Sequence, residues 1–386
     1  MRKSISKFVL AVLFAAGTAQ AQQVPTYKVD PTWPKPLPRA KAADGNMRTW
    51  ITGEVAGTCV DSHDHIFIAN RSWQNSPSGK LKDFEVQTGQ AAPPVVAFDT
   101  EGNIVTSWGD TTYEREGGPG KVLPENFHGC YADYEDNIWL PGTGDGIVQK
   151  YTHDGKFLMQ IGTKGKCDGK EDQSPNAFYK SCGDAMAGDS SKTLLNMPSD
   201  VFVDPNPDPQ NKQKGSIYIA DGYGNHRVVV FDAKGNYLRQ FGTPGNGPGQ
   251  FAVRGGGHPH CVLIGKDNLV YTCDRGNNRI EIFDKMGKFI REIKVLPDDL
   301  AFSGLKANDF DFVDATQKQG FAIDVTAGVI YVIDLAKSAI VGSFGSLGHN
   351  AGQMTGPHTL AVDSKGNVYV GEVMNGRRVQ KFIRQP

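Results

Sequence analysis

The sequence predicts an all-β chain folded as a six-bladed β-propeller. One pattern of short strands and turns recurs six times, for example in "GCYADYEDNIWL" (129–140) and "TLAVDSKGNVYVGEVMNGRRVQKF" (359–382). The strands alternate in polarity and are separated by turns rich in Gly, Asn and Asp, and no segment has a helical period. Repeats of about 40 residues or more that hold several strands each are typical of propellers.

Two elements are predicted to precede the repeats. Residues 1–21 combine a basic start, a short apolar run and an Ala-Gln-Ala end, which predicts a signal peptide cleaved after Ala21. The chain is therefore expected to be exported, and the short leader is typical of a bacterial periplasmic protein. Residues 22–46 are expected to form a closing segment, in which "YKVDPTWPKP" (27–36) supplies the fourth strand of the last unit. This pairing would close the ring and remove two exposed sheet edges.

The propeller itself is predicted to span residues 47–386. In the fifth unit, "FAID" is interpreted as the first strand and "VIYVID" as the second. Glycine-rich linkers at 241–251 and 344–354 suit the sharp connections from unit 3 to unit 4 and from unit 5 to unit 6. Polar segments at 108–120 and 163–192 are predicted to be surface loops. The six units contain the segments 58–71, 129–140, 200–242, 261–293, 321–334 and 359–382.

The charge of the chain argues against nucleic acid as a partner, and its hydropathy argues against a membrane span. The formal net charge is −1, from 41 basic and 42 acidic residues. Without the three basic residues of the predicted leader, 38 basic residues face 42 acidic ones, a net charge of −4. This balance provides no basic surface for nucleic acid. No stretch is apolar over enough residues to span a bilayer. The sequence makes no prediction about the oligomeric state.

Six cysteines are compatible with disulfide bonds in an exported chain. Cys167 and Cys182 lie in one polar, glycine-rich insertion, so we predict a disulfide that ties this loop together. The other four lie in or beside apolar strands and are interpreted as buried thiols. These four are Cys59, Cys130, Cys261 and Cys273.

Three histidines occupy one position of the repeat. The second-strand aromatics that align the units are Phe67, Trp139, Tyr218, Tyr271, Tyr331 and Tyr369. Eleven residues before those of units 2, 4 and 6 stand His128, His260 and His358. The corresponding positions of units 1, 3 and 5 carry small residues: Ala56, Ser199 and Gly320. Alternate blades of a six-fold ring would bring the three imidazoles together in the central channel.

Three histidine ligands with an open fourth position are typical of a catalytic zinc site. Zinc is the first choice because every ligand is a nitrogen, although copper, iron or another divalent ion could bind the same set. His258 is out of register with the three, and we interpret it as a loop residue or as support for the site. The alternative for each histidine alone is an ordinary hydrogen-bonded residue beside the channel.

Further candidate residues follow the second strands. Arg71 and Arg275 each stand four residues after the strand's aromatic, and Tyr223 stands five after it. We expect them in loops on one face of the channel. Two guanidinium groups beside a metal suggest an anionic substrate, in particular a carboxylate held by two hydrogen bonds. Positive neighbours would also suit Tyr223 to act as a general base.

The repeats resemble the NHL repeat, most closely in "ADGYGNHRVVVFDAKGNYLRQFGTPGNGPGQF" (220–251). The candidate site resembles that of the peptidyl-α-hydroxyglycine α-amidating lyases, six-bladed NHL propellers that cleave a peptidyl-α-hydroxyglycine to a peptide amide and glyoxylate. The zinc-binding histidines of that family match "NFHGC", "GHPHC" and "GPHTL", which contain His128, His260 and His358. Its catalytic tyrosine matches Tyr223 in "ADGYGN", and its two functional arginines match Arg71 in "ANR" and Arg275 in "CDRGNNRI".

This resemblance implies a lyase in which the metal polarises the substrate oxygen, Tyr223 takes the hydroxyl proton and the arginines hold the carboxylate. The family has an aspartate directly after its third histidine, linked to a structural calcium, whereas this sequence has Thr359. That difference leaves a calcium site open. It also leaves open a related enzyme that acts on another hydroxylated or carboxylated small molecule, by lyase or hydrolase chemistry.

Two other functions compete with the lyase. The first is a non-enzymatic propeller that binds a protein or glycan partner, a frequent role of NHL repeats. The second is a lactonase-like hydrolase, whose site would rely on carboxylates around a central calcium. Four acids stand near the appropriate strand ends, although such acids also cap turns in NHL blades. They are Asp221, Asp274, Asp334 and Glu372.

Overall fold

A computed structural model represents the protein, and the predicted signal peptide (1–21) lies outside the residues that it describes. Most of the two predicted surface loops also lies outside them. Within the described part of the chain, no helix is long and apolar enough to cross a membrane. The described residues are 23–42, 44–71, 88–109, 123–124, 126, 128–167, 190–253, 258–295 and 306–386.

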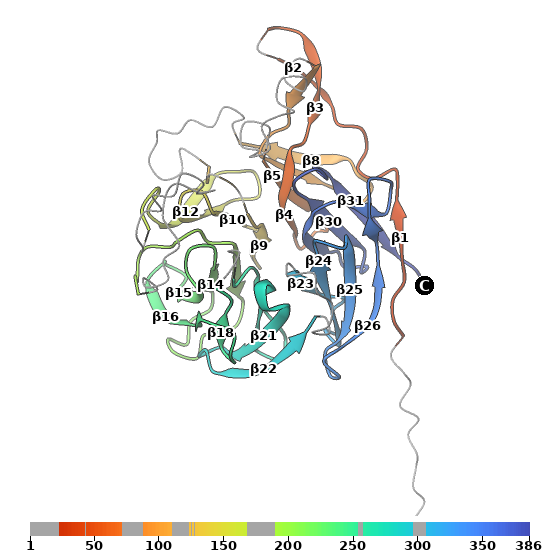
Figure 1. Ribbon diagram of the computed structural model, residues 1–386. Helices are drawn as coiled ribbons and strands as arrows, with labels where there is room; N and C mark the ends of the chain where they lie inside the picture. Colours follow the sequence, from red (N-terminus) through yellow and green to blue (C-terminus); the bar gives the residue numbers. More distant parts are fainter. Residues whose placement is uncertain are drawn as a thin grey trace, which may run out of the picture.

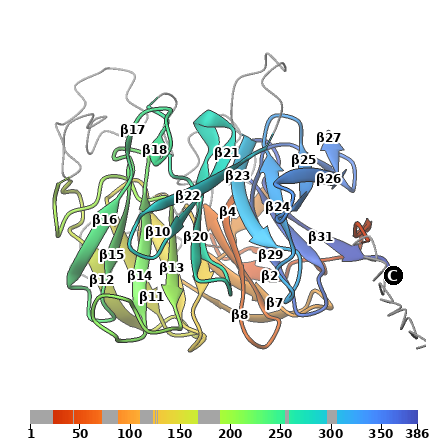
Figure 2. The ribbon, with the colours of Figure 1, turned by 90° about the horizontal axis from the view of Figure 1, so that it is seen from below.

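The described residues form six four-stranded sheets, which are the six blades predicted from the repeats. The blades follow one another around a central channel, as Figure 1 shows along the axis of the ring. Figure 2 shows the ring from its side, with the strands of neighbouring blades standing next to one another. Neighbouring strands of each blade are antiparallel.

The first three blades run in chain order from the inner strand outward. Blade 1 consists of β4 (Glu54–Val60), β5 (Ile66–Arg71), β7 (Val95–Phe98) and β8 (Ile104–Trp108). Blade 2 consists of β9 (Tyr131–Ala132), β10 (Ile138–Gly142), β11 (Ile147–Tyr151) and β12 (Phe157–Gly162). Blade 3 consists of β13 (Asp200–Asp204), β14 (Ser216–Asp221), β15 (Arg227–Phe231) and β16 (Tyr237–Phe241).

Blades 4 and 5 repeat this order, and blade 6 takes its fourth strand from the N-terminal segment. Blade 4 consists of β19 (Val262–Ile264), β20 (Leu269–Asp274), β21 (Arg279–Asp284) and β22 (Phe289–Lys294), with the short 3-10 helix η1 (Arg275–Asn277) after β20. Blade 5 consists of β23 (Lys306–Phe312), β24 (Gln319–Asp324), β25 (Val329–Asp334) and β26 (Ala339–Phe344). Blade 6 consists of β29 (Pro357–Val362), β30 (Val368–Glu372), β31 (Val379–Arg384) and β1 (Tyr27–Asp30).

The N-terminal segment connects the last blade with the first. β1 pairs antiparallel with β31, with Tyr27 opposite Arg384. Further along the segment, the buried indole of Trp33 packs between the two blades. Its ring centroid lies 5.5 Å from that of Phe98 in blade 1 and 4.9 Å from that of Tyr369 in blade 6. Aromatic burial therefore reinforces the pairing of β1 with β31.

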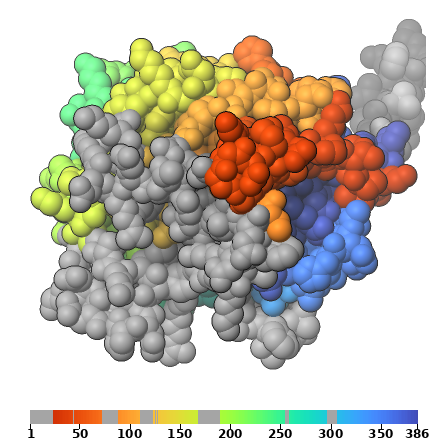
Figure 3. Space-filling model, turned by 90° about the horizontal axis from the view of Figure 1, so that it is seen from above, coloured from red at the N-terminus to blue at the C-terminus, as the bar shows by residue number. Residues whose placement is uncertain are grey.

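Small sheets lie outside the blades. β2 (Arg39–Lys41), β3 (Met47–Ile51) and β6 (Gly89–Ala91) form a three-stranded sheet that projects from the ring in Figure 1. In Figure 3 the β2–β3 hairpin of this sheet belongs to the red patch that faces the viewer. The two predicted linkers each hold a short parallel pair, β17 (Thr243–Pro244) with β18 (Gln250–Phe251) and β27 (Ser346–Leu347) with β28 (Gln353–Met354).

The hydrophobic core lies between neighbouring blades, because each strand turns apolar side chains to both faces of its sheet. Between blades 3 and 4, for example, Tyr218 and Val230 pack with Val270 and Phe283. The stacking holds each blade at a defined angle to the next. It places the first residues of all six inner strands around the channel.

The prediction for the fifth unit was wrong by one strand. "FAID" belongs to the second strand β24, and "VIYVID" is the third strand β25. The second-strand aromatic is the buried Phe321, and Gly320 lies in β24 rather than at the start of the innermost strand. The innermost strand is β23, "KANDFDF". The sequence did not reveal it because Asn308, Asp309 and Asp311 make it more polar than the other inner strands.

The interpretation of four cysteines as thiols was also wrong. Cys59 of β4 and Cys130, next to β9, form a disulfide between blades 1 and 2. Cys261 and Cys273 form a second one within blade 4. Strand burial is compatible with a thiol or a disulfide, and only the short Cα–Cα distances of 5.3 and 4.8 Å within the two pairs decide between them. Cys167 is disulfide-bonded, and its predicted partner Cys182 lies outside the described residues.

Removing the disulfide between blades 1 and 2 is expected to cost more stability than removing the one within blade 4. The first joins residues 71 apart in sequence and the second joins residues 12 apart. Loop-closure entropy predicts losses of about 4 and about 3 kcal/mol respectively. Urea unfolding of Cys59→Ala/Cys130→Ala and Cys261→Ala/Cys273→Ala proteins measures both. Equal or reversed losses would contradict this order.

Candidate metal centre and active site

The structure brings the three repeat histidines together in the channel. His128 precedes β9, His260 precedes β19 and His358 lies in β29, so each stands at the start of the inner strand of an even-numbered blade. One ligand atom from each lies within 4.8 Å of the others. Their ring centroids are 4.5 to 5.1 Å apart, and all three side chains are buried. We call these three residues the axial histidine site.

Each axial histidine is oriented by the next blade. In all three, Nδ1 lies within hydrogen-bond distance of a backbone carbonyl, which can only accept, so Nδ1 must carry the proton. Nε2 then holds a lone pair that faces the channel. This pattern is typical of metal-binding histidines, whose second nitrogen is fixed by a hydrogen bond. The carbonyls that His128, His260 and His358 meet belong to Ser199, Asn308 and Ala56, at 2.9, 2.5 and 3.0 Å.

The electrostatic surroundings keep the three imidazoles neutral. Burial, and then the positive charges of Arg71 and Arg275, lower the pKa of His358 to about 3. Burial also lowers the pKa of His128 and of His260 well below the usual range. The charge of Arg275 contributes to both pKa shifts, and the charge of Arg71 contributes to that of His128. A neutral imidazole is the form that coordinates a metal. The donor set therefore fits a divalent transition metal: three neutral nitrogens, correctly oriented and unprotonated at neutral pH.

Tyr223 stands directly beside this site. It follows β14, and its hydroxyl lies 2.8 Å from Nε2 of His128 and 3.3 Å from Nε2 of His260. Arg275, the first residue of η1, donates from Nη2 to the same hydroxyl at 3.0 Å. The guanidinium also lies over the tyrosine ring, 5.1 Å from its centroid. A cationic donor at the tyrosine oxygen stabilises negative charge there.

Arg71 reaches the channel from the other side. It ends β5 in blade 1, and its Nη1 lies 3.4 Å from a carboxylate oxygen of the buried Glu54. Arg71 and Arg275 both lower the pKa of His128 and His358, so their charges reach the axial histidine site from two blades. The structure thus brings five of the six candidate residues into contact with one another, and the charge of the sixth, Arg71, acts on them from blade 1.

The loop that carries Tyr223 is held by the segment before His260. Gly222 accepts a hydrogen bond from the backbone N–H of His258 through its carbonyl, at 2.8 Å. A side chain at Gly222 would collide with the carbonyl oxygen of Pro259, 1.9 Å from the position of its Cβ, so this close approach requires glycine. His258 is buried, and its Nδ1 accepts the N–H of Gly276 at 3.1 Å. It therefore supports the loops of Tyr223 and Arg275.

Asn308 is a functional candidate that the sequence did not reveal. Its carbonyl orients His260, and its Oδ1 accepts a hydrogen bond from Nη1 of Arg275 at 2.7 Å. Its Nδ2 donates to the carbonyl of His358 at 2.7 Å. This buried side chain therefore connects two axial histidines with an arginine. The repeat position of Asn308 would have pointed to it if β23 had been identified as the innermost strand.

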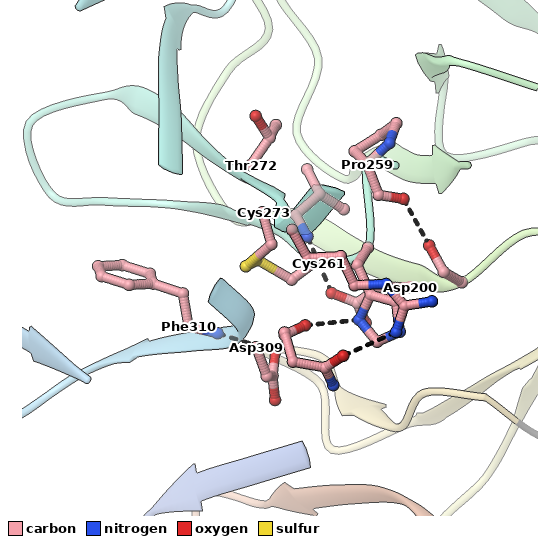
Figure 4. The surroundings of a disulfide bond; sticks show 12 residues. Asp200, Pro259, Cys261, Thr272, Cys273, Asp309 and Phe310 are labelled. Carbon is pink, nitrogen blue, oxygen red and sulfur yellow. Dashed lines mark hydrogen bonds between the residues drawn. A yellow bond between two sulfur atoms is a disulfide. The ribbon is translucent and has the colours of Figure 1, made fainter. Parts of the chain in front are cut away.

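A cavity of about 150 Å³ continues along the channel from His128 and His260. Residues from all six blades line it, among them Thr58, Asp200, Asp309, Asp311 and Thr359. Figure 4 shows Asp200 and Asp309 near the Cys261–Cys273 disulfide. Thr359, the residue after His358, donates to Oγ1 of Thr58 at 3.1 Å. At this position the chain therefore has a neutral pair of hydroxyls.

Replacing Asp311 with asparagine is expected to stabilise the protein at alkaline pH relative to acidic pH. Burial raises the pKa of Asp311 to about 7, from an ordinary value of about 3.9. The unfolded chain therefore loses this proton first, and the carboxylate destabilises the fold as the pH rises from about 4 through about 7. Urea unfolding of wild type and Asp311→Asn at pH values on both sides of this window tests the sign. A pH-independent difference would contradict it.

The four acids on which the lactonase alternative depends form ion pairs within their own blades. Each lies within ion-pair distance of a basic residue a few positions later in its own blade: Asp221 with Arg227, Asp274 with Arg279, Asp334 with Lys337 and Glu372 with Arg378. Three of them also accept a backbone N–H of a preceding loop. These acids fix blade turns. Their pairing removes the observation that had suggested a calcium-dependent hydrolase.

Known proteins resemble this chain over most of its length. Residues 211–254 match a family described as a 6-bladed beta-propeller. NHL repeat-containing protein 3 of Homo sapiens is 26% identical over 378 residues, which cover 92% of this chain and 84% of that protein. Peptidyl-alpha-hydroxyglycine alpha-amidating lyase 1 of Drosophila melanogaster is 26% identical over 351 residues, which cover 76% of this chain and 57% of that protein.

The fold is also similar to those of solved structures. An auxiliary nutrient binding protein from Bacteroides thetaiotaomicron covers 87% of this chain, and 70% of its own, with a TM-score of 0.51 and 11% identity. The similarities confirm the six-bladed propeller and the resemblance to amidating lyases. The chain spans little more than half of the Drosophila lyase.

Proposed function

We propose that the protein is a metal-dependent lyase that cleaves an N-acyl-α-hydroxyglycine, or a closely related hydroxylated carboxylate. The observation that carries this proposal is the position of the Tyr223 hydroxyl, within hydrogen-bond distance of two axial histidines and of Arg275. The residues proposed as base, metal ligands and anion-binding group thus lie within hydrogen-bond distance of one another. The similarity to the Drosophila lyase supports the same chemistry.

His128, His260 and His358 would hold the ion, for which zinc is the first choice because all three ligands are imidazole nitrogens. A divalent ion bound there supplies Lewis acidity toward a substrate oxygen. The proposal does not include calcium, because Thr359 contributes a neutral hydroxyl where the family has an aspartate.

The chain's own residues account for substrate binding and proton transfer. Arg71 and Arg275 would bind the substrate carboxylate and orient the hydroxyl-bearing carbon toward Tyr223. Tyr223, as phenolate, would accept the hydroxyl proton. The electron pair of the O–H bond becomes the new C=O bond, the C–N bond breaks, and the amide nitrogen takes a proton from Tyr223. The products are an amide and glyoxylate, and the base is restored.

A direct assay tests the proposal. Metal-replete protein is incubated with an N-acyl-α-hydroxyglycine, and glyoxylate release is followed beside a blank that contains the His260→Ala protein. We expect turnover that a chelator abolishes and that a carboxamide analogue of the substrate does not support. Metal-loaded protein that releases no more glyoxylate than the blank would contradict the lyase. Binding of a protein or glycan without turnover would then favour the non-enzymatic alternative.

Arg71→Lys is expected to raise KM about tenfold or more, with a smaller change in kcat. Lysine keeps the positive charge beside Glu54, so the fold is retained, but it cannot form the two parallel hydrogen bonds of a guanidinium. One lost hydrogen bond to a charged group corresponds to about 1.5–3 kcal/mol. Steady-state kinetics of the lyase reaction measure the effect. An unchanged KM would mean that Arg71 does not bind the carboxylate.

Export is part of the same proposal. The N-terminal leader predicted from the sequence would direct the chain out of the cytoplasm. The Cys59–Cys130 and Cys261–Cys273 disulfides are stable in the oxidising environment that the chain would then reach. Mass spectrometry of the secreted protein should find an N-terminus at residue 22. A mature chain that keeps residues 1–21 would contradict the proposed cleavage.

A further inference from the structure

A second group of histidines lies at the opposite face of the ring. Asp61 and His65 belong to the turn between β4 and β5 of blade 1, and His153 belongs to the turn between β11 and β12 of blade 2. β5 runs from this turn to Arg71, so its six residues, about 20 Å of extended strand, separate the group from the active-site loops. We call Asp61, His65 and His153 the inter-blade cluster.

Three donor atoms converge in this cluster. Oδ2 of Asp61 lies 2.9 Å from Nδ1 of His65 and 3.2 Å from Nε2 of His153. The two ring nitrogens lie 3.4 Å from each other. Ligand atoms of a metal bound at about 2.1 Å, with angles between 90° and tetrahedral, are separated by about 3.0–3.4 Å. The three atoms therefore already have the spacing of one face of a coordination shell.

Other contacts hold the ligands in place. Oδ1 of Asp61 accepts the backbone N–H groups of His63 and His65 at 2.9 and 2.8 Å, which turns Oδ2 toward the two rings. The backbone carbonyl of His153 accepts the indole N–H of Trp108 at 3.1 Å, and its ring packs edge-on against Phe67 at 4.9 Å. Hydrogen bonds that orient a ligating carboxylate are typical of metal sites.

The cluster is also open to solvent on one side. The side chain of Asp61 is fully buried, whereas those of His65 and His153 are 26% and 34% exposed. An ion could enter between the two rings, replace their protons that face Asp61, and keep water on its remaining positions. Two imidazoles and one carboxylate suit divalent Zn, Cu, Ni, Co or Fe.

We infer that the inter-blade cluster is a second binding site for a divalent transition metal, independent of the axial histidine site. The ion would connect the turns of blades 1 and 2, the blades that the Cys59–Cys130 disulfide also joins. A bound ion would stabilise the packing of these two blades on each other. The inference does not depend on the proposed lyase function.

Zinc titration of chelator-treated protein tests the inference. Wild type is expected to bind two zinc ions per chain, and His65→Ala and His153→Gln one each. His260→Ala is expected to bind one, and the double variant His260→Ala/His153→Gln none. The control variant His349→Ala, which replaces an exposed loop histidine, should still bind two zinc ions. Lyase activity should be unchanged in His153→Gln, because the cluster lies away from the active-site loops.

Two results would overturn the inference. The first is an equal zinc stoichiometry in wild type and His153→Gln. The second is a His260→Ala protein that binds no zinc, in which case Asp61 would hold the two histidines by hydrogen bonds alone. Circular dichroism and urea unfolding in chelator show whether each variant is folded. Cu²⁺ electron paramagnetic resonance of the His260→Ala protein provides a second readout, with hyperfine coupling to two nitrogens expected and its absence contradicting the site.

Discussion

Replacing His260 with alanine is expected to eliminate the axial metal and to lower lyase turnover about a thousandfold or more. His260 supplies one of three neutral nitrogens, and two imidazoles without a third ligand bind a divalent ion weakly. Lewis acidity contributes several kcal/mol to such reactions, and each 1.4 kcal/mol corresponds to a tenfold change in rate. Metal analysis and single-substrate kinetics measure the two effects.

The measurement needs two controls. It is made in protein that also carries His153→Gln, so that only the axial ion is counted. His349→Ala replaces an exposed histidine of a loop and should leave metal content and turnover unchanged. If His260→Ala keeps one metal ion in that background and retains its turnover, the axial histidine site is not the catalytic centre.

Tyr223→Phe is expected to lower kcat by about 10²- to 10⁴-fold while metal content stays constant, the range typical of a lost general base. The substitution removes only the hydroxyl that lies 2.8 Å from His128 and 3.0 Å from Arg275. The ring that packs against His128 and under the Arg275 guanidinium remains. KM should change little if the arginines bind the carboxylate. Rapid-quench or steady-state kinetics of glyoxylate release test this.

Tyr271→Phe is the matched control. Tyr271 loses the same atom, but its hydroxyl donates to Asp267 at 2.8 Å and its ring lies in the core beside blade 5. This variant should keep full turnover and lose some stability. Equal rates of wild type and Tyr223→Phe would exclude Tyr223 as the base and leave the proton to another acceptor.

The number of blades and the meeting of the axial histidines could be predicted because both depend on the repeat. A repeated position occupies an equivalent place in every blade, so His128, His260 and His358 could be compared without any other sequence. The ends of the second strands obey the same rule, which is why Tyr223 and Arg275 could be placed on one face. The spacing of the repeat therefore predicts which side chains of different blades lie close together.

Features that depend on contacts between blades could not be predicted. Asn308 escaped notice because β23 is too polar to resemble the other inner strands. The Cys59–Cys130 bond depends on the spacing of two neighbouring inner strands. His65 and His153 are 88 residues apart. One lies between the first and second strands of blade 1 and the other between the third and fourth strands of blade 2, so no repeat position relates them. Packing of one blade on the next decides the last two.

Anomalous X-ray diffraction from zinc-loaded crystals, recorded on both sides of the zinc absorption edge, tests the central claim most directly. The account predicts a peak in the channel bonded to Nε2 of His128, His260 and His358, with the hydroxyl of Tyr223 beside it. An axial histidine site that shows no anomalous peak in zinc-saturated crystals would contradict the account.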